Sequence, residues 1–123
     1  MFKSLILDYN LDHFYKFFQE TDFELQKLKS NTLTLKAKQK INETIKDHQI
    51  SLRKNFVDML LAVDKNLYND TLNELDILVD YFTEIMFNPD ILLTQSEGFE
   101  AHISQKLIET KTNILKIFFG YKG

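Results

Sequence analysis

Three carboxylates in one row could bind a divalent metal ion. Asp76, Asp80 and Glu84 follow one another at steps of four residues, which places them along one face of a helix. Stacked carboxylate oxygens suit Mg²⁺, and a bound Mg²⁺ could support phosphate hydrolysis. Because no second acidic row is predicted to face this one, a metal-dependent phosphohydrolase is the less favoured interpretation. A solvent-exposed helix face is the simpler one.

The three histidines offer a second kind of chemistry. His13, His48 and His102 fall in three different predicted helices. Helical di-iron proteins need Glu-x-x-His pairs, whereas the residues three positions before these histidines are asparagine, isoleucine and phenylalanine. We therefore expect no metal or other cofactor. His48 is expected to be buried and hydrogen-bonded, and His102, followed by Lys106, is a remote candidate for a phosphotransfer histidine.

Other catalytic motifs are missing from the sequence. The chain has three glycines and no cysteine, which excludes a glycine-rich phosphate loop, a thiolate nucleophile and a disulfide. No serine or threonine lies in a nucleophile-elbow context. The sequence therefore predicts a protein that is not an enzyme. The absence of cysteine and of an apolar run of about 20 residues favours a soluble, cytoplasmic protein without a membrane span.

The basic residues are concentrated in one segment. Eight of the fifteen lie between Lys27 and Lys54, against only Glu43 and Asp47, so this window carries +6 and the rest −9 of the total −3. Such a basic hairpin tip could bind nucleic acid or another anion. The candidate anion-binding residues are Lys36, Lys38, Lys40, Lys46, Arg53 and Lys54. With a single arginine and no interleaved aromatic residues, a solvated face with ion pairs is favoured instead.

The composition and apolar spacing predict one helical domain. The chain has 123 residues, of which 44% are hydrophobic and 27% charged, as in a single soluble domain covering residues 1–123. One proline and three glycines argue against a turn-rich β fold. Apolar residues recur at steps of three and four, which predicts helices at about 4–29, 33–67, 71–86 and 96–120. We expect an all-α fold, an antiparallel four-helix bundle with a long second helix.

The predicted helices have defined boundaries and core faces. We expect breaks at 30–34, at 68–71, where Thr71 and Glu74 form a capping box, at 87–90, and at Gly120. The predicted core residues of the first two helices are Leu7, Leu11, Phe14, Phe18, Thr21, Leu25, Leu28, and Ile41, Ile45, His48, Leu52, Phe56, Met59, Val63, Leu67. Those of the last two are Leu72, Leu75, Val79, Phe82, Met86, and Phe99, Ile103, Leu107, Thr110, Ile114, Ile117.

A second set of apolar residues lies off these core faces. On the second and fourth helices they fall about 120–160° away from the core stripe. They are Ile50, Val57, Leu61, Tyr68, Ile108, Leu115 and Phe119, joined at the start of the first helix by Phe2, Leu5 and Ile6. In an up-down-up-down bundle all three groups lie towards one end. They either form an interface, as a homodimer seam or a groove for a partner helix, or bury one another inside the bundle.

The favoured function is therefore that of a non-catalytic protein–protein interaction module of the adaptor, chaperone or inhibitor type. It would act by self-association, by binding a partner helix, or by both. The candidate partner-binding residues are Ile50, Val57, Leu61, Tyr68, Leu115 and Phe119, with Phe23 and Tyr121 as further candidates. An anion or nucleic-acid binding module is the alternative. In size and helical outline the chain resembles small secretion or flagellar chaperones and small helical immunity proteins, which is a resemblance of class alone.

Overall fold

A computed structural model describes residues 8–121 of the chain, with side chains from residue 11 onward. All secondary structure in these residues is helical, which confirms the predicted all-α class. The predicted helical residues 4–7 and the apolar residues Phe2, Leu5 and Ile6 lie outside the described range.

Four helical arms follow one another along the chain. The first is α1 (Asp8–Leu25), extended by the 3₁₀ turn η2 (Gln26–Lys29). The second consists of α2 (Leu35–Leu52), the π-helical turn η3 (Arg53–Val57) and α3 (Asp58–Leu60). The third is α4 (Lys65–Met86). The fourth consists of α5 (Ser96–Phe99), a second π-helical turn η4 (Glu100–Ser104) and α6 (Gln105–Gly120).

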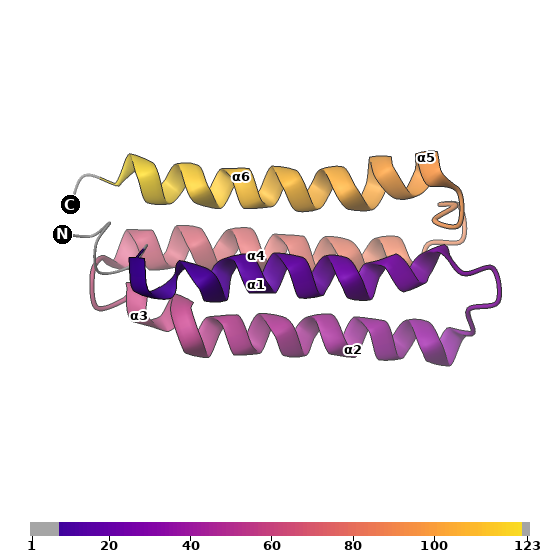
Figure 1. Cartoon of the computed structure of the whole chain (residues 1–123), viewed down its shortest axis with the longest axis horizontal. Coiled ribbons are helices and arrows are strands. Elements are labelled where there is room, and N and C mark those ends of the chain that lie inside the picture. Colours follow the sequence, from indigo (N-terminus) through magenta and orange to yellow (C-terminus); the bar gives the residue numbers. More distant parts are fainter. Residues whose placement is uncertain (1–7, 122–123) are drawn as a thin grey trace.

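The arms alternate in direction, and each connection reverses the chain (Figure 1). The first arm contacts the second and the fourth, and α4 contacts the same two. The start of α1 and the end of α6 consequently lie at the same end of the molecule, as does the turn between α3 and α4 (Figure 1).

One hydrophobic cluster connects all four arms. At its centre the rings of Phe14, Phe56 and Phe118 meet, with Phe118 5.6 Å from each of the other two centroids and all three side chains fully buried. The predicted core faces of α1, α4 and α6 are buried among the described residues, except that Leu11, Leu72 and Ile117 are only partly covered. The ring of Phe118 meets the rings of Phe14 and Phe56 edge to face. Such contacts add to the free energy gained by burying the rings.

Three of the predicted breaks are confirmed, and one of them is the end of α6 at Gly120. Thr34 precedes α2, and its side-chain hydroxyl accepts a hydrogen bond from the backbone N–H of Ala37, as an N-cap does. At the remaining break α4 ends at Met86, two residues before Asn88, which precedes the only proline.

The predicted break at 68–71 is wrong. The helix α4 runs through these residues, and its cap is Asp64, whose carboxylate accepts hydrogen bonds from the backbone N–H groups of Asn66 and Leu67. Thr71 is buried in the core instead of starting a capping box. Burial of Leu67 and Thr71 outweighs the weak helix propensity of the polar residues between them.

The second helix also departs from the prediction, because it ends at Leu60 and contains a π-helical turn. α2 is continuous through residues 47–51, but η3 holds one residue more per turn than an α-helix. The buried face therefore changes within this turn and beyond it. Val57 and Leu60 are buried in place of the predicted Met59 and Val63, which are partly buried and exposed, respectively.

Candidate functional site

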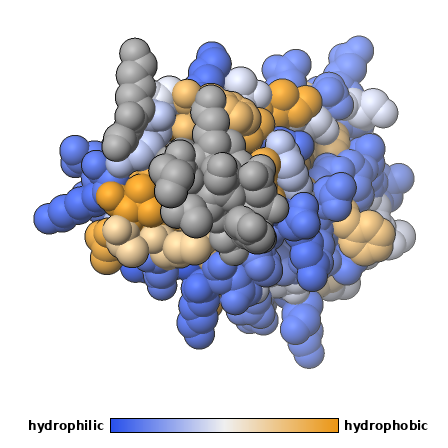
Figure 2. Space-filling model, turned by 60° about the vertical axis from the view of Figure 1, so that its left-hand side comes forward, coloured by the Kyte–Doolittle hydropathy of each residue, from blue (hydrophilic) through white to orange (hydrophobic). Residues whose placement is uncertain are grey.

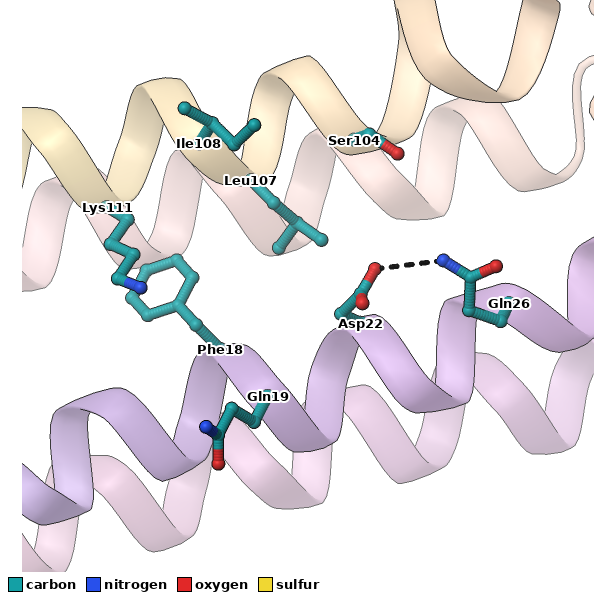
Figure 3. A pocket seen from close by; sticks show the side chains of 8 residues that line it. All are labelled: Phe18, Gln19, Asp22, Gln26, Ser104, Leu107, Ile108 and Lys111. Carbon is teal, nitrogen blue, oxygen red and sulfur yellow. Dashed lines mark hydrogen bonds between the residues drawn. The ribbon is translucent and has the colours of Figure 1, made fainter. Parts of the chain in front are cut away.

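The first and fourth arms leave a hollow between them on the surface. It has a volume of about 330 Å³ and is lined by Phe18, Gln19, Asp22, Gln26, Ser104, Leu107, Ile108 and Lys111. Figure 3 shows Phe18 and Leu107 pointing into the space between the two helices, so the floor of the hollow is apolar. Both side chains are almost fully buried, so packing in the core holds the floor of the hollow in place.

The charges that line this hollow already have partners. The ammonium group of Lys111 lies 5.0 Å from the ring centroid of Tyr15 on α1, in a cation–π contact. The carboxylate of Asp22 accepts a hydrogen bond of 3.2 Å from the side-chain amide of Gln26 (Figure 3). Both contacts are to uncharged groups, so a ligand that covered the hollow would have to offset the desolvation of an ammonium and a carboxylate.

An uncharged row of side chains borders the hollow along α6. Ile108, Thr112, Leu115 and Phe119 follow at steps of four, three and four residues and fall within about 60° of one another around the helix. Ile108 is 62% exposed and Phe119 54%, Thr112 is exposed and Leu115 is partly buried. We call these four residues the outer stripe of α6. It shares Ile108 with the hollow.

The other predicted partner-binding residues do not join this surface. Val57 is fully buried, because the π-helical turn rotates it into the core. Of the two alternatives for the second apolar set, an interface or internal burial, Val57 therefore follows internal burial. Ile50 and Leu61 are half exposed on the second arm and the turn after it. Tyr68, on α4, is partly buried, and its hydroxyl accepts a hydrogen bond from the guanidinium of Arg53. This hydrogen bond, together with the nearby charges, raises the pKa of Arg53.

Exposed apolar side chains do occur at the expected end of the molecule. Leu61, Val63 and Phe119 are exposed where α3 and α6 end. Figure 2 shows this end turned forward, with hydrophobic residues lying among hydrophilic ones. Other exposed apolar residues are distributed elsewhere, including Phe23 on α1, which is 73% exposed, and Ile77 on α4.

The predicted anion-binding residues are spread around their helix. At about 100° per residue, Lys38 and Lys40 point in nearly opposite directions, and Lys38 lines a different hollow, between the two loops at the far end. Arg53 is engaged with Tyr68 and lies 3.5 Å from the carboxylate of Asp58. Lys36, Lys46 and Lys54 are exposed. These six residues do not converge on one site.

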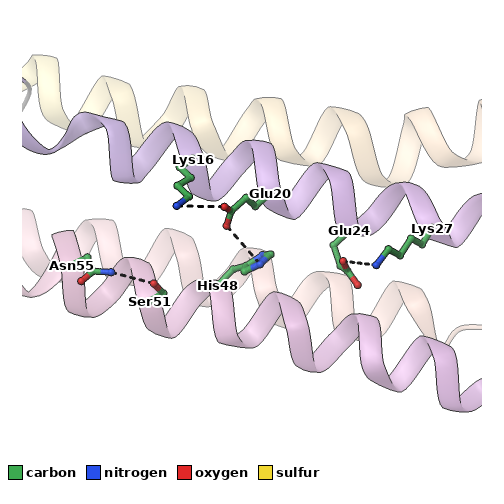
Figure 4. Close-up of polar contacts among 7 residues, drawn as sticks. All are labelled: Lys16, Glu20, Glu24, Lys27, His48, Ser51 and Asn55. Carbon is green, nitrogen blue, oxygen red and sulfur yellow. Dashed lines mark hydrogen bonds and ion pairs between the residues drawn. The ribbon is translucent and has the colours of Figure 1, made fainter.

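One of the three histidines, His48, makes a side-chain polar contact that the sequence could not specify. Nε2 of His48 is 3.7 Å from the carboxylate of Glu20, which also lies 3.7 Å from the ammonium of Lys16 (Figure 4). His48 is only partly buried, and its Nδ1 has no hydrogen-bond partner among the described residues, so the expected hydrogen-bonded histidine is not observed. His13 and His48 both line a small cleft between the first and second arms, while His102 lies in η4.

The acidic row also lacks a converging partner. Asp76, Asp80 and Glu84 are exposed on α4, and Asp76 accepts a hydrogen bond from the side-chain amide of Gln49 on α2. In residues 8–121, no group of three or more histidine, aspartate or glutamate side chains is arranged to hold a metal ion.

Of the eight residues that line the hollow, the sequence singled out only Ile108 as a candidate interface residue. Phe18 and Leu107 were assigned to the core, and they do lie there, but each also forms the floor of the hollow. Thr112 carried no apolar signal, although its position between Ile108 and Leu115 completes the 4–3–4 spacing. That spacing is the signal from which the outer stripe of α6 could have been found.

Comparison with known proteins gives no relative. The sequence matches no protein-family model, no curated protein and no solved structure. In the part of the chain that the structure describes, no helix is both long and apolar enough to cross a membrane.

Proposed function

We propose that the chain is a non-catalytic protein–protein interaction module of the adaptor, chaperone or inhibitor type. In this proposal an antiparallel four-helix bundle serves as a rigid scaffold, and the outer stripe of α6 with the adjoining hollow is the binding surface. A partner would bind by laying an apolar helix face along this surface.

The outer stripe of α6 is the observation that carries the proposal. Its residues form a continuous uncharged row with Ile108 62% exposed, beside a hollow that has a buried apolar floor. An isolated exposed aliphatic side chain is common on protein surfaces, but an ordered row next to a concave apolar surface is typical of interfaces.

Site-specific photo-crosslinking in the cells that make the protein tests this proposal. A photoreactive amino acid replaces Ile108 in one variant and Ile77 in the control, because Ile77 is similarly exposed, at 47%, but lies on α4 away from the stripe. We expect adducts of discrete mass above 14.6 kDa at position 108 and none at position 77. Thr112→Asp, which places a charge within the stripe, should abolish them.

The proposal fails if neither position gives an adduct, or if both positions give the same adducts. It also fails if Thr112→Asp leaves the adducts at position 108 unchanged while the variant keeps its helical circular-dichroism spectrum. Thr112 is exposed, so we expect this substitution to change the free energy of unfolding by no more than about 0.5 kcal/mol.

A further inference from the structure

We infer that the outer stripe of α6 binds the same stripe of a second copy of this chain, with the two α6 helices antiparallel. This inference rests on the proposed function and names its partner. Three features of the described residues support it: the spacing of the stripe, the charges beside it and the hollow at one end of it.

The spacing of the outer stripe is symmetric about its own midpoint. Ile108 and Phe119 are equally far from a point between residues 113 and 114, and so are Thr112 and Leu115. A two-fold axis through that point sets Ile108 against Phe119 of the second copy and Thr112 against Leu115 of the second copy. Steps of four, three and four are those of a heptad seam, so the side chains of two such helices can interlock.

The charges beside the stripe favour the antiparallel arrangement. Glu109 and Lys116 lie on the same flank, at about 220° and 200° from Ile114 on the helix, and both are exposed. Their midpoint nearly coincides with that of the stripe, so antiparallel pairing brings Glu109 beside Lys116 of the second copy, twice by symmetry. In a parallel pair this flank would face the opposite flank of the second copy, so Glu109 and Lys116 of the two copies would not meet. Glu109, whose side chain is 63% exposed, lies 4.0 Å from the ammonium of Lys106, and its charge also acts on Tyr81.

The hollow gives the paired helix a place for its aromatic anchor. Ile108 forms part of the wall of the hollow, above Phe18 and Leu107 (Figure 3). Since the two-fold axis sets Phe119 of the second copy against Ile108, that ring lies at the mouth of the hollow. Each chain thereby offers one ring and one hollow, so both sites are filled in a symmetric dimer, as an isologous interface requires.

Disulfide trapping tests the arrangement without altering the apolar stripe. The chain has no cysteine, so Glu109→Cys and Lys116→Cys can be made singly and mixed in equal amounts under mild oxidation. We expect a disulfide-linked dimer in the mixture. Glu109→Cys alone should give little, because in the antiparallel pair the two copies of residue 109 lie roughly 13 Å apart along the axis, beyond the ~7 Å that a disulfide spans between Cα atoms. Mixing Glu109→Cys with Ile77→Cys is the control.

Each outcome decides the inference. Equal linkage in Glu109→Cys alone and in the mixture overturns the antiparallel geometry, and the absence of linkage in the mixture overturns self-pairing. If no linkage forms but position 108 still crosslinks to a different protein, the proposed function stands and only the self-pairing is wrong. If position 108 gives no adduct at all, both fail.

Discussion

At the scale of single residues, Tyr81 shows how a π-helical turn is stabilised. Its hydroxyl donates a hydrogen bond of 2.9 Å to the backbone carbonyl of His102, which lies within η4. A π-helical turn disturbs the regular i to i−4 hydrogen bonding of the helix, so a side-chain donor from a neighbouring helix supplies a partner. Burial, and to a lesser degree the charge of Glu109, raises the pKa of Tyr81 above its ordinary value of 10.0.

This raised pKa predicts a loss of stability in alkaline solution. The neutral phenol is favoured in the folded chain, so its contribution is fully present below pH 10, where the unfolded tyrosine ionises, and is lost as the pH rises through the higher folded pKa. We expect the thermal midpoint to fall above about pH 10, and to fall less steeply in Tyr81→Phe. Tyr15→Phe, on the surface of α1, is the matched control. Equal slopes in the wild type and Tyr81→Phe would contradict this explanation.

At the scale of elements, the cap of α4 decides where the second arm ends. Asp64 holds two backbone N–H groups at 2.8 and 3.0 Å, while Thr71, seven residues later, buries a hydroxyl that has no hydrogen-bond partner among the described residues. The sequence pattern pointed to Thr71 as the helix start, and the structure assigns this position to Asp64. The two residues should therefore respond to substitution in opposite directions.

We expect Asp64→Ala to lower the free energy of unfolding by about 1 kcal/mol, because two backbone donors lose their acceptor. Thr71→Val keeps the shape of the side chain and removes the buried hydroxyl, so it should be neutral or stabilise the chain by up to ~1 kcal/mol. Urea denaturation of the three proteins measures both changes. A destabilisation of 1 kcal/mol or more by Thr71→Val would indicate that its hydroxyl has a structural role that the geometry does not show.

The helices also show which parts of the fold could be predicted from the sequence. Helical periodicity was sufficient to find the four arms and most buried residues, because an apolar face repeats at each turn. It could not locate η3, since a π-helical turn depends on packing between helices, and this turn changes which residues are buried both within it and beyond it. The exchange of Met59 and Val63 for Val57 and Leu60 is the direct result.

The candidate site was predictable only in part for a related reason. Ile108, Leu115 and Phe119 were found from their angle on the helix, because that angle depends on the sequence of α6 alone. Their neighbours across the hollow belong to α1, and the sequence does not say which two arms lie side by side. The prediction grouped these three residues with Val57 and Ile50, which both lie on the second arm. Of these two, Val57 is buried and Ile50 is exposed.

At the scale of the whole molecule, the four helical arms bury one core and leave a second ordered apolar row on α6. A chain of this size needs only one buried face on each arm, and α1, α4 and α6 each have one. The outer stripe of α6 is surplus to that requirement. We propose that this stripe is a binding surface and that its partner is a second copy of the chain.

Solution mass by light scattering tests this claim most directly, for the wild type, Ile108→Asp and the matched control Ile77→Asp. We expect the wild type and Ile77→Asp at twice 14.6 kDa, and Ile108→Asp as a folded species at 14.6 kDa, its dimer Kd raised at least about tenfold, or ~1.4 kcal/mol. A wild type at 14.6 kDa up to high protein concentration would contradict self-pairing. A dimer that survives Ile108→Asp unchanged would show that the contact lies on another face.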